Sequence, residues 1–327
     1  MKAVFLDRAT LLAANAGAVL EEIDFSALAT AVSEWDWYDR TAVDEIRERI
    51  ADATIVVTNK VVLDRQTLLE VAQRGTLRLI CVAATGTNNV DIATATELGI
   101  AVCNVRGYAT NSVTEHVFAM MLALIRHLPS YYNAVLAGDW QRSRDFCLLE
   151  FPVGELSGRK LGVVGYGELG QSVARMAQAF GMRVVVAEWP GISEPCTQIA
   201  LPRLICEADI ITLHCPLTSA TQHLFGVEQF AAMQSHALLI NTARGGLVDE
   251  PALADALRSG QIGGAAVDVL SSEPPPAEHP LLQTDIPNLV ITPHIAWASA
   301  AARQCLIDEI ARNIHAWLAG QHRNRIC

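Results

Sequence analysis

Short runs of apolar, mostly β-branched residues alternate along almost the whole chain with segments whose apolar residues recur at helical spacing. The short runs predict buried strands, and the longer periodic segments predict helices. The predicted strands are residues 3–6, 54–58, 77–82, 100–104, 160–164, 183–187, 210–214, 237–241, 264–268 and 289–292. Helices are predicted between most of them, for example at 64–73, 169–180 and 250–259. This alternation predicts an α/β fold whose parallel sheets are covered by helices on both faces.

Residue chemistry marks the ends of several predicted helices. Asp64 and the pair Asn111-Ser112 precede helical segments and are predicted to be N-caps, whose side chains accept hydrogen bonds from the first turn. Gly181 directly follows a predicted helix, where glycine commonly ends a helix in a left-handed conformation. The Ser- and Pro-rich segment 271–276 predicts a loop after a strand.

The segment 112–128 differs from the other predicted helices because residues 117–125 are nine consecutive apolar residues that leave no polar face. A helix that is apolar all round is buried on all sides, so we expect it to pack between layers or against another subunit. A membrane span needs about 20 apolar residues, so this run is too short to be one. The polar stretch 139–145 that follows indicates a boundary, after which a second sheet begins at Lys160.

Composition narrows the function classes. Lys and Arg total 24 and Asp and Glu total 35, so the formal net charge is −11. An acidic surface repels phosphate backbones and anionic lipids, so neither nucleic acid nor a membrane is an expected partner. Hydrophobic residues make up 51% and charged residues 18%, which excludes a disordered chain. A length of 327 residues favours two domains.

Cysteine and histidine usage bears on compartment and metal binding. The chain begins without a signal peptide pattern, and its eight cysteines form no CxxC pair, so we expect a reduced, cytoplasmic protein. Most histidines lack metal-ligand spacing, so no metal site is predicted. These histidines are His127, His223, His236, His279, His315 and His322. His116, on the apolar helix, is expected to be structural.

A strand that runs into a Gly-x-Gly-x-x-Gly loop and then a helix occupies residues 161–170. Gly165 suits the tight turn, Gly167 lets the backbone approach a pyrophosphate, and Gly170 lets the helix pack closely on the strand. The helix N-terminus would present N–H groups and a positive dipole end to the phosphates. Glu188 lies 18 residues beyond Gly170, at the end of the next predicted strand, and would accept hydrogen bonds from ribose hydroxyls.

The residues after this acidic position favour one nicotinamide cofactor. Trp189, Pro190 and Gly191 include no arginine for a 2′-phosphate, which favours NAD over NADP. The alternative is a tight strand–helix turn in some other α/β protein. Because the glycine loop lies near the middle of the chain, a complete α/β unit precedes it. We therefore expect two doubly wound domains with a cleft between them.

Three charged side chains follow late strands. Arg244, Glu273 and His294 each come after a predicted buried strand, and ligands of open α/β sheets bind beyond the carboxyl ends of strands. Arg244 offers a bidentate fork for a carboxylate or keto-acid oxygens. His294 can carry a proton near neutral pH, and Glu273 would hold its charged form. The roles of two nearby residues have alternatives. His214 would either contact the cofactor or be structural, and Trp297 would either shape the pocket or pack in the core.

Five motifs together carry a resemblance that covers nearly the whole chain. They are ATGTNNVD at 84–91, GYGELG at 165–170, NTARGGLVDE at 241–250, DVLSSEP at 268–274 and TPHIAWA at 292–298. With these motifs the chain resembles the D-isomer-specific 2-hydroxyacid dehydrogenases, most closely the bacterial glycerate dehydrogenase and hydroxypyruvate reductase branch. The resemblance implies catalytic roles for Arg244, Glu273 and His294, with substrate contacts by Thr85, Gly86, Arg244 and His294.

The resemblance also implies the cofactor contacts. NAD would be bound by Gly165, Gly167, Glu168, Leu169, Gly170, Glu188, Thr242, Ala243 and Asp268. Among these, the amides of Glu168 and Leu169 would meet the pyrophosphate, and Asp268 would bond the nicotinamide carboxamide. The helix near 112–128 would form the interface of a homodimer.

A crossed domain order follows from the same resemblance. Residues 1–103 and 295–327, including a C-terminal helix at 298–320, would form a flavodoxin-like substrate-binding domain. Residues 104–294 would form a Rossmann-like NAD-binding domain inserted into it. From the residues alone, a simple split into N-terminal and C-terminal halves is the expectation.

Two positions depart from the usual pattern of the family. Asn88 stands where aspartate is common, which removes a charge from the loop, and Arg106 stands where proline is common. Arg106 would either bias the site towards a more anionic substrate or lie on the surface. The family's formate dehydrogenases have glutamine in place of Glu273, which disfavours that activity. The chain ends soon after the last predicted helix, which argues against the long phosphoglycerate dehydrogenases.

The predicted reaction is therefore the NADH-dependent reduction of a small 2-keto acid to a D-2-hydroxy acid. Hydroxypyruvate to D-glycerate is the favoured reaction, with glyoxylate as a side substrate. Two alternatives remain: the same chemistry on a bulkier keto acid, and a non-catalytic NAD(H)-sensing protein. Sequence alone does not identify the side chains that form the pocket walls.

Overall fold

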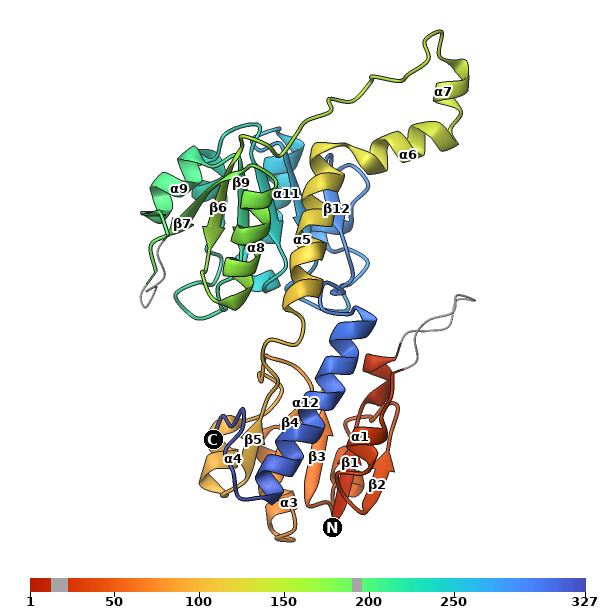
Figure 1. The fold of residues 1–327 in the computed structure, drawn as a ribbon, viewed down its shortest axis with the longest axis vertical. Coiled ribbons are helices and arrows are strands. Elements are labelled where there is room, and N and C mark those ends of the chain that lie inside the picture. The colour runs from red at the N-terminus through yellow and green to blue at the C-terminus, as the bar shows by residue number, and fades with distance from the viewer. Residues whose placement is uncertain (13–22, 190–195) are drawn as a thin grey trace. The chain divides into compact units, whose positions relative to one another are not determined.

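The computed structural model describes residues 1–12, 23–189 and 196–327. The chain divides into two compact units (Figure 1). Unit 1 is Met1–Ala109 with Ala298–Cys327, and unit 2 is Thr110–Trp297. Both divisions fall a few residues later in the chain than the sequence predicts.

Backbone hydrogen bonds explain the two shifted boundaries. The amide of Asn104 donates to Asn324 O (3.1 Å) and that of Val105 donates to Ala84 O (3.0 Å), which fixes the segment 104–109 in unit 1. The amides of Ile295 and Ala296 both donate to the Asp268 carboxylate at 2.9 Å. Residues 295–297 therefore remain with unit 2.

Unit 1 is built on a five-stranded, all-parallel sheet with the order β2-β1-β3-β4-β5. Its strands are β1 (Lys2–Phe5), β2 (Glu34–Trp37), β3 (Ile55–Thr58), β4 (Leu79–Val82) and β5 (Ala101–Cys103). Its helices are η1 (Arg8–Leu11), α1 (Ser26–Ala29), α2 (Ile46–Arg49), α3 (Arg65–Ala72), α4 (Ile92–Glu97) and α12 (Ala300–Leu318). This strand order is the flavodoxin-like one and confirms the fold predicted for this part.

Unit 2 is built on a seven-stranded, all-parallel sheet with the order β12-β11-β10-β9-β6-β7-β8. Its strands are β6 (Lys160–Val164), β7 (Arg183–Ala187), β8 (Gln198–Ile199), β9 (Ile210–Leu213), β10 (Leu238–Asn241), β11 (Gly264–Val267) and β12 (Leu289–Ile291). The order reverses between β6 and β9, which is the switch point of a Rossmann sheet and confirms the doubly wound prediction.

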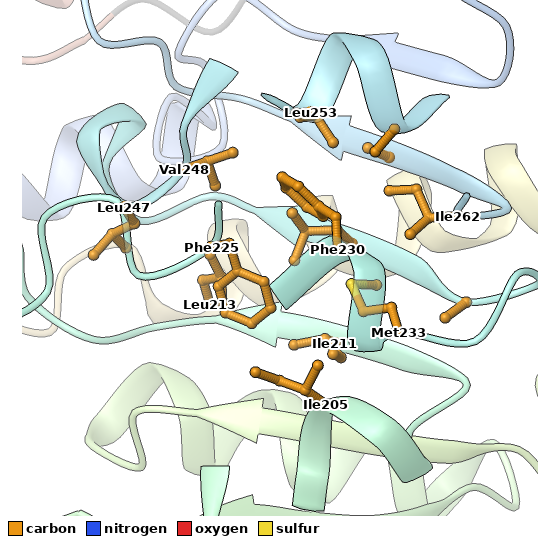
Figure 2. Packing of buried hydrophobic residues seen from close by; sticks show 14 of the residues in the cluster. Ile205, Ile211, Leu213, Phe225, Phe230, Met233, Leu247, Val248, Leu253 and Ile262 are labelled. Carbon is orange, nitrogen blue, oxygen red and sulfur yellow. The ribbon is translucent and has the colours of Figure 1, made fainter. Parts of the chain in front are cut away.

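Unit 2 has helices that pack on its sheet, α5 that runs beside it, and α6 and α7 that project away from it (Figure 1). They are α5 (Thr110–Ile125), α6 (Leu128–Leu136), α7 (Asp139–Arg142), α8 (Glu168–Ala179), α9 (Leu201–Glu207), α10 (Val227–Ala232), η2 (Gly245–Leu247), α11 (Glu250–Arg258) and η3 (Pro280–Leu282). Figure 2 shows part of the core, where Phe225, Phe230 and Leu253 meet Ile211 and Leu213 of β9. This packing holds the strands whose carboxyl ends carry the predicted site.

The ends of α5 differ from the prediction. The helix already begins at Thr110, so Asn111 and Ser112 lie inside it and the predicted N-cap is wrong. It stops at Ile125, and a separate helix, α6, begins at Leu128 with Pro129 in its first turn. Proline has no N–H to continue the hydrogen-bond ladder, so it starts a helix rather than extending one.

The other caps follow the sequence. The Asp64 side chain accepts from the Thr67 amide (2.8 Å), and Gly181 follows α8 with φ +74°. Within the described ranges no helix is both long and apolar enough to cross a bilayer. The apolar helix α5 is only partly enclosed within the chain, because Glu115 and Ala119 are exposed. Burial on all sides is therefore not achieved within the single chain.

Candidate active site

The glycine loop between β6 and α8 has the geometry that its spacing predicts. Gly165 has φ +94°, and a Cβ there would lie 2.5 Å from Cys215 N. A Cβ on Gly170 would lie 2.1 Å from Gly165 O, so only glycine lets the helix come this close to the turn. A Cβ on Gly167, the N-cap of α8, would meet nothing within 4 Å. The loop therefore leaves an open approach to the first turn of a 12-residue helix, where Glu168 and Leu169 lie.

Two buried polar atoms at the carboxyl edge of the same sheet lack partners among the described residues. They are His214 Nδ1, directly after β9, and Thr242 Oγ1, directly after β10. His214 Nε2 bonds Thr212 Oγ1 (2.9 Å), and burial lowers the pKa of His214 to about 4. Buried polar atoms are normally paired, so unpaired ones at the carboxyl edge of a Rossmann sheet fit a polar ligand such as the dinucleotide.

Glu188 lies directly after β7, which pairs with β6. Its side chain is exposed, and its amide donates to Ile199 O (2.9 Å). This is the position from which an acidic group bonds ribose hydroxyls in Rossmann folds. Pro190 and Gly191, which entered the NAD-over-NADP argument, lie outside the described residues.

The loop after β10 presents Arg244. The buried Asn241 side chain braces this loop, because its Nδ2 donates to Arg244 O (2.9 Å) and its Oδ1 accepts from the Ala243 amide (3.0 Å). Arg244 is exposed, its Nη1 donates to Ala243 O (2.7 Å), and it pairs with no carboxylate in the described part of the chain. A braced guanidinium without a protein counter-ion can bind an anionic ligand.

His294 and Glu273 form a direct pair. His294 Nδ1 lies 2.6 Å from Glu273 Oε2, and the other oxygen of Glu273 accepts from the Leu270 amide (2.9 Å). Both side chains are about one-third exposed. Since Nδ1 faces the carboxylate, Nε2 is the ring atom left to exchange a proton with a ligand. Trp297 Nε1 donates to His294 O (3.0 Å) and so packs beside the histidine backbone.

Asp268, directly after β11, is the anchor of the histidine loop. Its buried carboxylate accepts from Thr292 Oγ1 (2.6 Å) and from the amides of Ile295 and Ala296 (2.9 Å each). The His294 amide also donates to Asp268 O (2.8 Å). These three donors fix the loop on both sides of His294.

The three charged residues thus share one edge of one sheet. They follow β10, β11 and β12, which are consecutive neighbours. The Arg244 and Glu273 loops touch, because a Cβ on Gly245 would lie only 2.0 Å from Leu270 C. His294 and Glu273 are therefore in direct contact, and the loop that carries Arg244 touches the loop that carries Glu273.

The Thr85 loop in unit 1 is also held by side chains. Thr85 Oγ1 donates to Val105 O (2.8 Å), and Asn104 Nδ2 donates to Thr85 O (2.7 Å). Thr85 is exposed and Gly86 is half-buried, so this loop is accessible to a ligand. Asn88 and Arg106 are exposed.

Several supporting residues escape sequence reasoning. Glu250 and His279 are buried, 29 residues apart in sequence, and bonded at 3.1 Å. Glu250 also accepts from the amide and hydroxyl of Ser271, which precedes Glu273 in the same loop. No local pattern links these residues. No cluster of His, Cys, Asp or Glu in the described ranges could hold a metal ion.

Comparison with known proteins is consistent with this geometry. The family described as "D-isomer specific 2-hydroxyacid dehydrogenase, NAD binding domain" matches residues 118–296. The glycerate dehydrogenase of Methylorubrum extorquens is 43% identical over 324 residues, covering 99% of this chain and 98% of that protein. The hydroxypyruvate reductase of Blautia hydrogenotrophica is 37% identical over 331 residues, covering 99% of each.

The fold is shared as well. The apo-structure of D-lactate dehydrogenase from Escherichia coli superposes with a TM-score of 0.78 at 26% identity and covers 100% of both chains. The family match spans more than half of this chain, and both relatives align with nearly all of it. The chain belongs to the D-isomer-specific 2-hydroxyacid dehydrogenase family and is an NAD-dependent enzyme that reduces 2-keto acids to D-2-hydroxy acids.

Proposed function

We propose that the enzyme reduces hydroxypyruvate to D-glycerate, with glyoxylate as a second substrate. The pair of His294 Nδ1 and Glu273 Oε2 at 2.6 Å carries the catalytic part of this proposal. The substrate part is supported by the two relatives, whose names state glycerate and hydroxypyruvate as their substrates.

His294 is the proton donor in this proposal. Glu273 accepts the Nδ1 hydrogen bond and stabilises the imidazolium, so Nε2–H gives its proton to the substrate carbonyl oxygen as that oxygen gains charge. The histidine is left neutral and is recharged from solvent. Arg244, which pairs with no carboxylate among the described residues, binds the substrate's carboxylate and carbonyl oxygens. We also assign the accessible Thr85–Gly86 loop of unit 1 to substrate binding, through its backbone amides.

NADH, when bound, supplies the hydride that the keto carbon receives. In our assignment the first turn of α8, at Glu168 and Leu169, binds the pyrophosphate, and Glu188 accepts from the ribose hydroxyls. Thr242, Ala243 and Asp268 contact the nicotinamide half. The exposed carboxylate of Glu188 would repel a 2′-phosphate, so we expect NADH to be preferred over NADPH.

The test is NADH oxidation, followed by absorbance, with hydroxypyruvate, glyoxylate, pyruvate and 2-ketoisocaproate, each repeated with NADPH. We expect the highest kcat/KM for hydroxypyruvate with NADH. A preference for 2-ketoisocaproate would keep the mechanism and reject the glycerate assignment. Tight NADH binding without turnover of any keto acid would favour the NAD(H)-sensing alternative.

We further propose a homodimer. Figure 1 shows α6 and α7 projecting away from the sheet of unit 2. Large apolar side chains in the segment 128–153 are exposed, Phe146 at 91% and Leu149 at 78%. A run of exposed apolar side chains this long is typical of a protein interface. The apolar helix α5 leads directly into this segment. Light scattering of the wild type and of Phe146→Asp tests this, and a monomeric wild type would reject it.

A reducing, cytoplasmic compartment is proposed as well. Cys81, Cys103 and Cys215 are buried free thiols. Burial raises the pKa of Cys103 and of Cys215 to about 11, which keeps both sulfurs protonated and unreactive. Fractionation of the native host, with a cytoplasmic marker, tests this proposal.

A further inference from the structure

The helix α5 is apolar through most of its length but carries, besides the exposed pair Asn111 and Glu115, two less exposed pairs of polar residues spaced four apart. Thr110 and Thr114 form one pair, and Ser112 and His116 form the other. Residues spaced four apart lie on the same side of a helix. The two pairs therefore serve two different neighbours within unit 2.

The pair Ser112 and His116 contacts both ends of the loop that carries His294. Ser112 Oγ donates to Ala296 O at 2.7 Å. His116 Nε2 lies 2.9 Å from Thr292 Oγ1 and 3.5 Å from Asp268 Oδ1. One face of α5 thus reaches the residues two before and two after His294.

The directions of these hydrogen bonds follow from chemistry. A carboxylate can only accept, so the single Thr292 hydroxyl proton must point to Asp268 Oδ1, 2.6 Å away. The Thr292 oxygen then accepts from His116 Nε2–H. The chain of donors runs from His116 through Thr292 to Asp268, and aligned hydrogen bonds of this kind strengthen one another.

The loop needs such support, because His294 has φ +55°. A non-glycine residue in this left-handed region persists only when the surrounding structure holds it there. Asp268 supplies part of that hold, and Ser112 and His116 of α5 supply further contacts.

We propose that Ser112 and His116 are positioning residues of the reaction. They fix the loop 292–296 so that Nε2 of His294 stays aligned with the substrate oxygen, and neither touches the substrate. This inference rests on the proposed role of His294 as proton donor. It also revises the sequence-based expectation that His116 is merely structural.

The test compares His116→Leu and Ser112→Ala with a matched control on the same helix. Thr114→Val is that control, because Thr114 Oγ1 lies 2.9 Å from Ser172 Oγ of α8 and serves the other neighbour. Misplacing a reacting group by about 1 Å can cost about 100-fold in rate, so we expect a 10- to 100-fold loss of kcat in His116→Leu. The loss in Ser112→Ala should be smaller, and Thr114→Val should keep the wild-type kcat.

Rescue separates positioning from stability. His116→Gln can still donate from an amide nitrogen to Thr292 and should recover most of kcat, whereas an equally stable His116→Leu should not. The thermal midpoint of each variant is measured alongside. A wild-type kcat in both His116→Leu and Ser112→Ala overturns the proposal, as does a loss of kcat in Thr114→Val as large as theirs.

Hydrogen exchange by mass spectrometry gives a readout independent of turnover. Peptides covering 292–298 should exchange about 10-fold faster in His116→Leu and unchanged in Thr114→Val. If exchange behaves this way but the wild type turns over no keto acid, the proposed function is wrong, whereas the conclusion that His116 holds the loop 292–296 is retained. Unchanged exchange in His116→Leu would show that His116 does not hold the loop 292–296.

Discussion

At the carboxyl edges of both sheets a buried aspartate holds a neighbouring loop, but the two edges present different chemical groups. In unit 1, Asp7 follows β1, and its buried carboxylate accepts from the amides of Asn59, Lys60 and Val61 after the neighbouring strand β3. In unit 2, Asp268 follows β11 and holds the loop after the neighbouring strand β12 through three donors. In each unit a buried aspartate fixes the loop of the adjacent strand.

The difference lies in what the loops present. The edge of unit 2 presents charged side chains, Arg244, Glu273 and His294, and one of them has an unfavourable backbone conformation. The Thr85–Gly86 loop of unit 1 is held by Asn104 and Val105 and offers backbone groups. The comparison teaches that the proposed proton chemistry depends on the edge of unit 2, whereas the Thr85–Gly86 loop of unit 1 presents no charged side chain.

Removing the proton donor should have the largest effect. We expect His294→Ala to lower kcat by about 10²–10⁴, the usual contribution of a positioned general acid. The dissociation constant of NADH, measured by fluorescence quenching, should stay near the wild-type value, because the glycine loop is untouched. Turnover at the wild-type rate would contradict the assignment and remove the contrast between the two edges.

Changing the guanidinium should have the next largest effect. Arg244→Lys keeps the charge but loses the planar fork that pairs with two oxygens. A hydrogen bond to a charged group contributes about 1.5–3 kcal/mol, so we expect kcat/KM for the keto acid to fall about 10- to 100-fold. Steady-state kinetics measures this, and an unchanged kcat/KM would show that Arg244 does not bind the substrate.

Replacing each buried aspartate by asparagine tests the comparison directly. Both variants put an NH₂ group where backbone amides need an acceptor, which costs about 1–3 kcal/mol. In Asp268→Asn the strained His294 loop loosens, so we expect kcat to fall about 10-fold. Asp7→Asn should lower the unfolding free energy with little change in kcat. Equal losses of kcat would show that the two edges do not differ as proposed. Urea unfolding and initial rates provide both readouts.

Much of this architecture is readable from the chain, because buried parallel strands are nearly continuous apolar runs. The strand β2 escaped because Glu34-Trp35-Asp36-Trp37 alternates charged and aromatic residues at a sheet edge, and β8 has only two residues. Arg244, Glu273 and His294 could be selected from the chain because each follows a predicted strand within a distinctive motif, and their catalytic roles stay a prediction.

The supporting contacts were not predictable in the same way. The bond between Glu250 and His279, and the contacts of His116 with the His294 loop, join segments distant in sequence. Only the packing of helices on the sheet brings them together. The predicted helical segment 112–128 stops before Pro129, but α5 already ends at Ile125 and a separate helix, α6, which was not predicted, begins at Leu128.

The smallest expected effect is a change in how the unfolding free energy depends on pH, and it concerns the edge of unit 2. His214 lies at the edge of unit 2, and burial lowers its pKa to about 4, against about 6.5 in an unfolded chain. Between these values the unfolded chain binds a proton that the native protein does not, so the unfolding free energy falls as the pH decreases. This contribution is fully present above about pH 6.5.

His214→Gln keeps a donor for Thr212 but does not titrate, so its unfolding free energy should depend less on pH in this window. Denaturant unfolding at several pH values measures the slope, and identical slopes would mean that the His214 ring is protonated as readily in the native protein as in the unfolded chain.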